Sequence, residues 1–154
     1  MKNKEKEEEE LDFSQIPNNF LWCINSQCPK AGTCLRRLAE ECAPADIKHY
    51  SILSLKHLAD LKGECPYFCP DTKVRYAKGF LGILENLTAR QTRFLMARII
   101  NNSSRRTFYR VRSGERALSP LEQQSILNIL KECGVTFPVE FDAYFEDYYW
   151  GTSI

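Results

Sequence analysis

The chain has 154 residues, of which 44% are hydrophobic and 27% are charged, and its formal net charge is +1. This composition is that of a globular protein with one domain or two small subdomains, and it excludes a chain that is disordered throughout. No apolar run reaches the roughly 18 residues that a membrane-spanning helix needs, and the segment MKNKEKEEEELDF lacks the apolar stretch of a secretory signal. We therefore expect a cytoplasmic protein with no membrane partner.

The charges are strongly segregated along the chain. Residues 1–12 carry three Lys against five Glu and one Asp, and we expect them to form a disordered charged tail. Residues 90–116 carry eight Arg against one Glu, a net charge of +7, whereas residues 140–150 carry a net charge of −4. The value of +7 is the informative one, because a basic segment in a nearly neutral chain marks a surface for an acidic partner.

Residues 13–70 are predicted to form a Cys-rich module of turns and short helices, because they hold six of the seven cysteines and five of the seven prolines. The spacing of apolar residues in LRRLAEEC predicts a helix over Leu35–Cys42. The segment Ile47–Leu53 suits a short strand. Ser54 is a suitable N-cap for a second helix, which is expected to end at Gly63.

Residues 71–150 are predicted to be helical, which makes the fold class mainly α, with the Cys-rich module packed on a helical half. The strongest local signal is Ser119-Pro120-Leu121-Glu122, in which Ser caps a helix, Pro takes its first position and Glu closes a capping box. Similar start and stop signals divide this half into five expected helices, which cover Asp71–Asn86, Thr88–Ile100, Ser104–Ser113, Ser119–Gly134 and Val139–Trp150.

The cysteines of the module have the spacing of a metal site. Cys23, Cys28 and Cys34 fall within one loop that contains proline and glycine and can therefore curl around an ion. Tetrahedral zinc requires four ligands, and Cys65, which follows a glycine closely, is the natural fourth donor. Zinc is the expected metal, and an iron–sulfur cluster is the second choice.

Alternatives to this ligand set remain open in the sequence. Cys69 can replace Cys65, but Cys42 lies two helical turns after Cys34, about 12 Å away on a regular helix, so these two cannot easily share one ion. His49 and His57 are further possible ligands, although lone histidines are more often surface or core residues. The cysteines can also be buried free thiols or redox groups.

Three motifs carry a resemblance to a known family: C-x4-C-P-x4-C-L-R, then E-C-P-Y, then F-Y-R-V-R-S-G-E-R-x-L-S-P-x-E-Q-Q. In this order they resemble an uncharacterised family of small proteins from gut Bacteroidales, over roughly Phe13–Trp150. The resemblance implies a cysteine set of Cys23, Cys28, Cys34 and Cys65, and it requires neither Cys42 nor Cys69.

The segment Ser104–Ser113 is predicted to be a basic helix. Phe108 and Val111 fall on one side and are expected to be its buried anchors. The opposite surface is rich in arginine, which neutralises phosphate and reads guanine through two hydrogen bonds. The residues expected to contact nucleic acid, DNA above all, are Arg105, Arg106, Tyr109, Arg110 and Arg112.

The order of elements over residues 88–133 resembles the helix-turn-helix of Cro and phage repressors, and T-F-Y-R-V-R-S-G-E-R is similar to their recognition helix and exit turn. The first turn departs from that pattern, because Ile100-Asn101-Asn102 stands where those proteins carry a small residue and glycine. Asn tolerates the left-handed conformation that such a turn uses. The resemblance implies a DNA-binding regulatory protein.

A non-enzymatic protein-interaction adaptor with a structural zinc site is the alternative function. The segment FDAYFEDYYW is expected to dock an aromatic helical stripe of Phe141, Tyr144, Phe145 and Tyr148 on the core. Its carboxylates at Asp142, Glu146 and Asp147 would favour the adaptor if they covered the arginines. We expect no enzyme, because the sequence contains no phosphate loop or nucleophile elbow and only two histidines.

Overall fold

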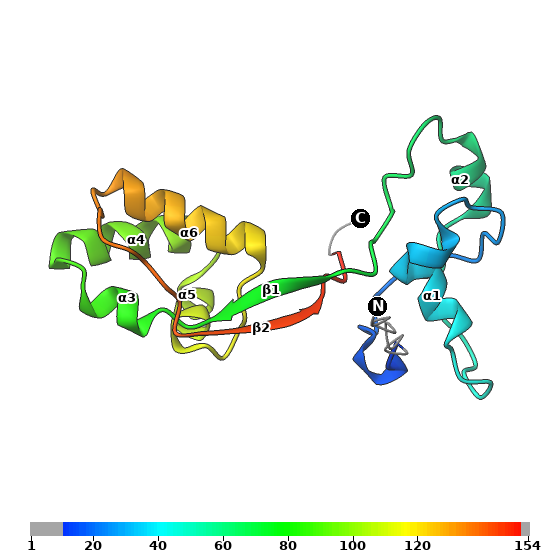
Figure 1. The fold of residues 1–154 in the computed structure, drawn as a ribbon, viewed down its shortest axis with the longest axis horizontal. Helices are drawn as coiled ribbons and strands as arrows, with labels where there is room; N and C mark the ends of the chain where they lie inside the picture. Colours follow the sequence, from blue (N-terminus) through cyan, green and yellow to red (C-terminus); the bar gives the residue numbers. More distant parts are fainter. Residues whose placement is uncertain (1–10, 152–154) are drawn as a thin grey trace, which may run out of the picture. The chain divides into compact units, whose positions relative to one another are not determined.

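The structure is a computed structural model that describes residues 11–151 (Figure 1). The described chain divides into two compact units. Residues 11–72 and 149–151 form the Cys-rich unit, and Lys73–Tyr148 form the helical unit. Residues 1–10 of the expected disordered tail lie outside the described residues. No helix within residues 11–151 is long and apolar enough to cross a membrane.

The Cys-rich unit is built from short helices and loops. Its elements are the 3-10 helices η1 (Phe13–Gln15) and η2 (Ala31–Thr33) and the α-helices α1 (Leu35–Glu41) and α2 (Leu55–Asp60). The predicted helix at Leu35–Cys42 is confirmed, and so is the Ser54 cap, whose hydroxyl accepts a hydrogen bond from His57 N–H at 3.3 Å. The predicted strand at Ile47–Leu53 is reduced to a single parallel bridge between Trp22 and Ile52.

Aromatic contacts and a buried arginine hold the loops of this unit together. The Trp22 ring stacks on Tyr50 with 4.2 Å between centroids, and Phe20 meets Trp150 edge to face at 5.1 Å. Arg36 is 6% exposed, and it donates hydrogen bonds to the carbonyl oxygens of Tyr67 and Leu21 at 2.9 and 2.7 Å. Because these carbonyls belong to two different loops, Arg36 fixes both loops to α1.

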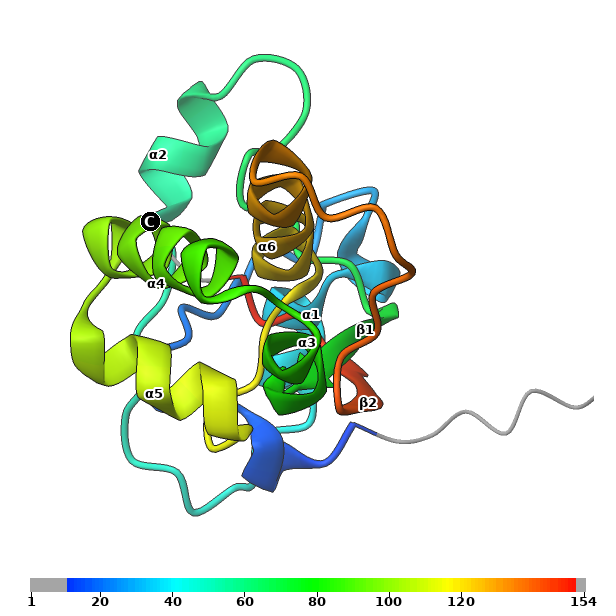
Figure 2. The same ribbon diagram turned by 90° about the vertical axis from the view of Figure 1, so that its left-hand side faces the viewer.

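The helical unit combines four helices with a two-stranded sheet. Strands β1 (Lys73–Lys78) and β2 (Ala143–Tyr148) pair antiparallel, from Lys73 opposite Tyr148 to Lys78 opposite Ala143. Helix α4 packs against both α5 and α6 (Figure 2). The bounds of the helices are Leu81–Glu85 for α3, Ala89–Asn102 for α4, Arg105–Ser113 for α5 and Pro120–Glu132 for α6.

Local start and stop signals determine the ends of α4, α5 and α6, as predicted. The capping boxes of Thr88 with Gln91 and of Ser119 with Glu122 are both complete, and Pro120 occupies the first turn of α6. Each box satisfies backbone N–H groups that the helix itself cannot bond. Ser104 caps α5, which ends at Gly114 in the left-handed conformation with φ of +83°.

Two predicted helices are wrong, and the fold is therefore mixed α/β rather than mainly α. The segment Asp71–Asn86 forms β1 and the short helix α3, because Gly79 breaks it with φ of +73°. The segment Val139–Trp150 contains β2, so its aromatic residues do not form a helical stripe. Strand β1 alternates Val74 and Tyr76 with polar residues and β2 is rich in aromatic residues, and both patterns suit a strand once a partner strand is available.

Candidate nucleic-acid interface and cysteine cavity

Helix α5 is anchored through one face. Phe108 and Val111 are 2% and 1% exposed, which confirms them as the buried anchors. The Phe108 ring meets Phe80 edge to face at 6.0 Å between centroids. Because residues three apart lie on one side of a helix, this pair fixes which way α5 turns its remaining residues.

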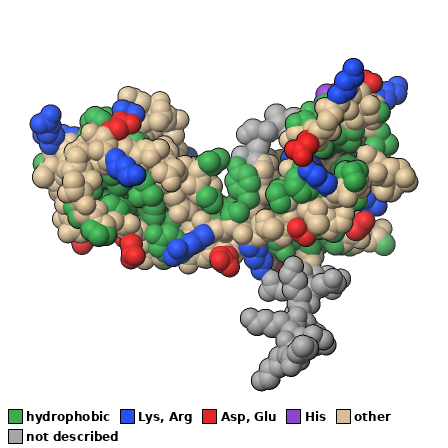
Figure 3. Space-filling model, turned by 45° about the horizontal axis from the view of Figure 1, so that its top comes forward, with side chains coloured by type: hydrophobic (Ala, Val, Ile, Leu, Met, Phe, Trp, Pro, Cys, Tyr) green, Lys and Arg blue, Asp and Glu red, His purple; other side chains and the backbone are tan. Residues whose placement is uncertain are grey.

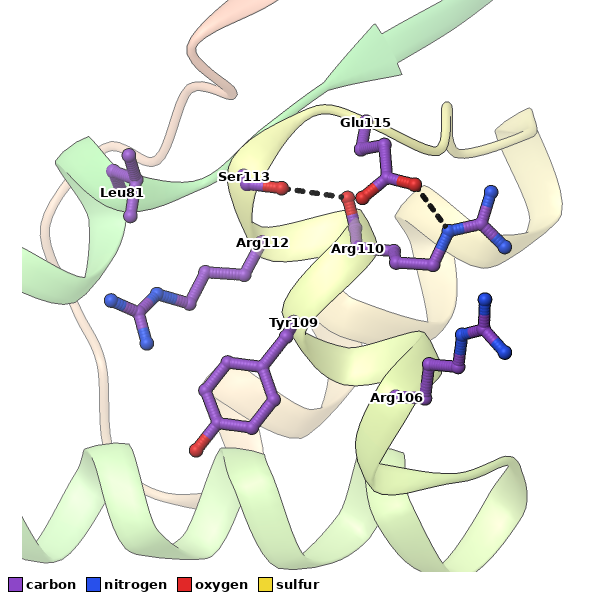
Figure 4. A pocket seen from close by; sticks show the side chains of 7 residues that line it. All are labelled: Leu81, Arg106, Tyr109, Arg110, Arg112, Ser113 and Glu115. Atoms are coloured by element: carbon purple, nitrogen blue, oxygen red, sulfur yellow. Dashed lines mark hydrogen bonds and ion pairs between the residues drawn. The ribbon is translucent and has the colours of Figure 1, made fainter.

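The other faces of α5 carry the predicted basic residues. Arg105, Arg106 and Tyr109 are exposed, and Arg110 and Arg112 are partly exposed. In Figure 4, Arg106 and Arg110 extend to one side of the helix, while Tyr109 and Arg112 extend to the other. The Arg112 guanidinium lies 5.7 Å from the centre of the Tyr109 ring, a cation–π contact that helps to orient both side chains.

These side chains surround an open hollow of about 740 Å³. Four of the five predicted residues line it, and Arg105 does not. Sequence reasoning missed the remaining lining residues, which are Leu81, Ser113 and Glu115. Leu81 comes from α3, so its place beside α5 depends on a tertiary contact that no local pattern shows.

The charge on this surface is only slightly neutralised by the protein itself. The Nε of Arg110 lies 2.9 Å from Oε1 of Glu115. Among residues 11–151, no carboxylate forms an ion pair with Arg105, Arg106 or Arg112. An unpaired cluster of guanidinium groups attracts anions, because each group keeps donors that water alone satisfies.

The acidic C-terminal segment does not cover α5. Asp142 instead accepts hydrogen bonds from the N–H groups of Leu81 and Gly82 at 2.7 and 2.9 Å. Glu146 stands opposite Arg75 in the sheet, and Oδ1 of Asp147 accepts from the N–H of Tyr148. The carboxylates that would have favoured the adaptor therefore lie at the start of α3 and on β2.

Basic side chains are dispersed on the face of the molecule that Figure 3 shows. On the face in Figure 3, Lys and Arg side chains occur at separate positions, with acidic and hydrophobic side chains among them. On α4, Arg98 pairs with Glu132 of α6 at 2.9 Å. Three arginines line the single concave surface beside α5.

The cysteines predicted to bind zinc share one small cavity in the Cys-rich unit. All four predicted ligands, Cys23, Cys28, Cys34 and Cys65, line this cavity, whose volume is about 30 Å³. That volume is close to the volume that one molecule occupies in liquid water. All seven cysteines are free thiols. Among residues 11–151, however, no group of three or more His, Cys, Asp or Glu side chains is placed so that it could hold a metal ion.

The other cysteines of this unit do not line the cavity. The Cys69 thiol donates to the carbonyl of Tyr149 at 3.2 Å, and burial raises the pKa of this thiol to about 11. The Cys42 thiol lies 3.5 Å from the carbonyl oxygen of Ala39 within its own helix. Of the two candidates for the fourth position, the structure therefore places Cys65 at the cavity and Cys69 against the backbone.

Two arginines of α1 also line the cavity. Arg37 forms ion pairs with Glu40 and Glu41, yet its Nε is buried and has no hydrogen-bond partner among the described residues. Arg36 brings a buried positive charge whose hydrogen bonds are to carbonyl groups. Neither arginine was predicted as part of this site, although LRRLAEE places both close to Cys34 in the sequence.

Neither histidine belongs to this site. The Nε2 of His57 lies 2.8 Å from the Tyr67 hydroxyl, and His49 is exposed. Neither of these residues lines the cavity, so any ligand set drawn from its walls consists of cysteine alone.

The chain was compared with known families and proteins. A family of unknown function, DUF6078, matches residues 1–150. No curated protein and no solved structure matches the chain.

Proposed function

We propose that this protein, which belongs to the DUF6078 family of unknown function, binds duplex DNA through α5 and acts as a regulatory protein. The observation that carries the proposal is the hollow lined by Arg106, Tyr109, Arg110 and Arg112, with a single carboxylate beside it. An α-helix fits the major groove of B-DNA, where arginine pairs with guanine and with phosphate.

The setting of α5 supports this proposal. Ser103 and Ser104 form the whole connection between α4 and α5. The buried side chains of Phe108 and Val111 anchor α5 to the core. A helix fixed in this way presents its arginines without having to order itself when it binds, which lowers the cost of association. The sequence of helix, short turn and basic helix over residues 88–133 also suits a helix-turn-helix reader.

The adaptor function is the second candidate. Leu81 and Tyr109 are 42% and 46% exposed at the hollow, so an acidic protein could use the same surface with some apolar contact. The two functions differ in their response to duplex DNA. The adaptor predicts weak or absent binding, and the DNA-binding function predicts binding that depends on the arginines of α5.

Fluorescence anisotropy with a labelled mixed-sequence duplex tests the proposal. Replacing Arg106, Arg110 or Arg112 by Ala should weaken binding by about 1 kcal/mol or more each, roughly fivefold in the dissociation constant. Arg98→Ala is the matched control, because it removes the same charge from an exposed position that pairs with Glu132. Equal effects of all four substitutions, or no binding by the parent protein, would contradict the proposal.

We also propose that the Cys-rich unit is stabilised by a structural zinc ion held by Cys23, Cys28, Cys34 and Cys65. The four thiols that line one small cavity support it. Tetrahedral Zn–S bonds of about 2.3 Å would require the thiol side chains to move inward, since no set is preformed. Bound zinc would supply folding energy rather than chemistry.

Metal analysis of the purified protein tests the zinc proposal, with iron measured alongside. One zinc ion per chain is expected, and a Cys23→Ser variant should lose both the metal and stability. Cys42→Ser is the control, because Cys42 lies outside the cavity. A metal-free protein in which both variants are as stable as the parent would contradict the proposal.

A further inference from the structure

The helical unit contains a second concave site, which lies between α4, α5 and α6. Its volume is about 240 Å³. Its apolar wall consists of Ile99, Val111, Leu118, Ile126 and Ile129. A closed apolar cavity of about 150 Å³ is enough to bind benzene, so this site has room for a molecule of one or two fused rings.

The rim of this cavity is polar and charge-balanced. Arg116 and Glu122 line it, and the Nη2 of Arg116 lies 2.7 Å from Oε1 of Glu122. Burial acts to raise the pKa of the Glu122 carboxyl, but hydrogen bonds from Ser119 and Arg116 outweigh burial and lower it. The pair therefore remains ionised near neutral pH and contributes no net charge to the rim.

Two further polar side chains at the rim are available to a ligand. Asn102 of α4 and Ser125 of α6 both line the cavity, and neither side chain forms a hydrogen bond to another residue of the described chain. An apolar wall with a few convergent polar groups is the usual construction of a small-molecule site. The balanced charge of the rim disfavours a charged ligand, because no unpaired counter-charge awaits it.

We infer that this cavity binds an uncharged aromatic molecule of one or two rings that carries a single hydrogen-bonding group, such as a ring N–H or a hydroxyl. The site is separate from the hollow beside α5, and the inference does not depend on DNA binding. Val111 lines the cavity and belongs to α5, so an occupant would contact the helix that carries the basic residues.

Titration with indole, followed by ¹⁵N–¹H correlation NMR of the full chain, tests the inference. Indole has two fused rings and one N–H group and is uncharged. We expect saturable shifts at Ile99, Val111 and Ile129, and much smaller shifts with indole-3-carboxylate at the same concentration. Absence of saturable shifts with indole, or equal binding of the carboxylate, would overturn the inference.

A variant that fills the cavity gives the matched comparison. Ser125→Trp should abolish the indole shifts, whereas Gln124→Trp should retain them, because Gln124 is exposed on the same helix but does not line the cavity. Asn102→Trp provides a second filling variant from α4. Shifts that persist in both filling variants would show that indole binds elsewhere and would overturn the assignment.

Discussion

The Nε of Arg110 lies 2.9 Å from Oε1 of Glu115, the acidic residue just beyond the end of α5. Both side chains are substantially exposed, so this pair is weak by itself. It is nevertheless the one ion pair that an arginine of α5 makes within residues 11–151. Within the described residues, the basic surface is thus paired with a carboxylate at Arg110 and at no other arginine of α5.

Removing this restraint should strengthen DNA binding. In Glu115→Gln, Arg110 loses its internal partner and the hollow loses its negative charge. A surface pair is worth about 0.2–1 kcal/mol, so we expect up to roughly fivefold tighter binding at low salt. Anisotropy with the same duplex measures the change. Weaker binding by this variant would indicate that Glu115 positions Arg110 productively.

The buried anchors of α5 should contribute mainly to the stability of the folded protein. Phe108→Ala removes a ring that is 2% exposed and should destabilise the protein by about 3–5 kcal/mol in urea unfolding. Tyr109→Ala, at a neighbouring position that is 46% exposed, should cost far less. Similar losses for the two variants would mean that α5 is not held by this face.

The exit turn of α5 should tolerate a side chain poorly. Gly114 and Gly134 both have positive φ, at +83° and +86°. An added Cβ at Gly114 would lie 3.4 Å from the nitrogen of Gly79, whereas at Gly134 it would meet nothing within 4 Å. Both Ala variants should lose about 1–2 kcal/mol from backbone strain. Because 3.4 Å is an ordinary van der Waals contact, urea unfolding should show similar losses for the two variants, and a several-fold larger loss for Gly114→Ala would contradict this packing.

The Glu122 carboxyl should make stability depend on pH. Burial alone would raise its pKa, but hydrogen bonds from Ser119 and Arg116 lower it below the usual value of 4.5. A carboxyl with a lowered folded-state pKa contributes stability that is present above its unfolded pKa and is lost as pH falls through its folded pKa. The stability difference between the parent and Glu122→Gln should therefore shrink as pH falls below about 4.5. A difference that stays constant with pH would show that the charge of Glu122 does not matter.

Helices with local signals could be predicted, and the strands could not. The hydrogen bonds of a capping box join residues that are three apart in the sequence, so the box is a local signal. The pairs Thr88 with Gln91 and Ser119 with Glu122 therefore predict the starts of α4 and α6. Strand β1 has no such signal, because its partner β2 begins at Ala143, far along the chain. The spacing of apolar residues predicted helices in these two segments, but pairing with a distant strand determines their structure.

In the candidate sites, too, residues placed by local patterns could be predicted and residues placed by tertiary contacts could not. The basic residues of α5 were predictable, because a helix with two apolar positions fixes the direction of all its other side chains. Leu81 was not, because it reaches the hollow from α3 through a tertiary contact that the sequence does not reveal. The grouping of Cys23, Cys28, Cys34 and Cys65 was predicted from the sequence, and these four cysteines line one cavity, but whether they bind zinc stays a prediction.

The salt dependence of duplex binding is the most direct test of the central claim. If the four arginines of α5 contact phosphates, the logarithm of the association constant should fall with the logarithm of salt concentration at a slope near −3.6, about −0.9 per contact. Removing Arg106 should reduce the magnitude of that slope by about one unit on any sequence. A variant without all four arginines that binds duplex DNA with the slope of the parent would show that α5 is only a solvated basic surface.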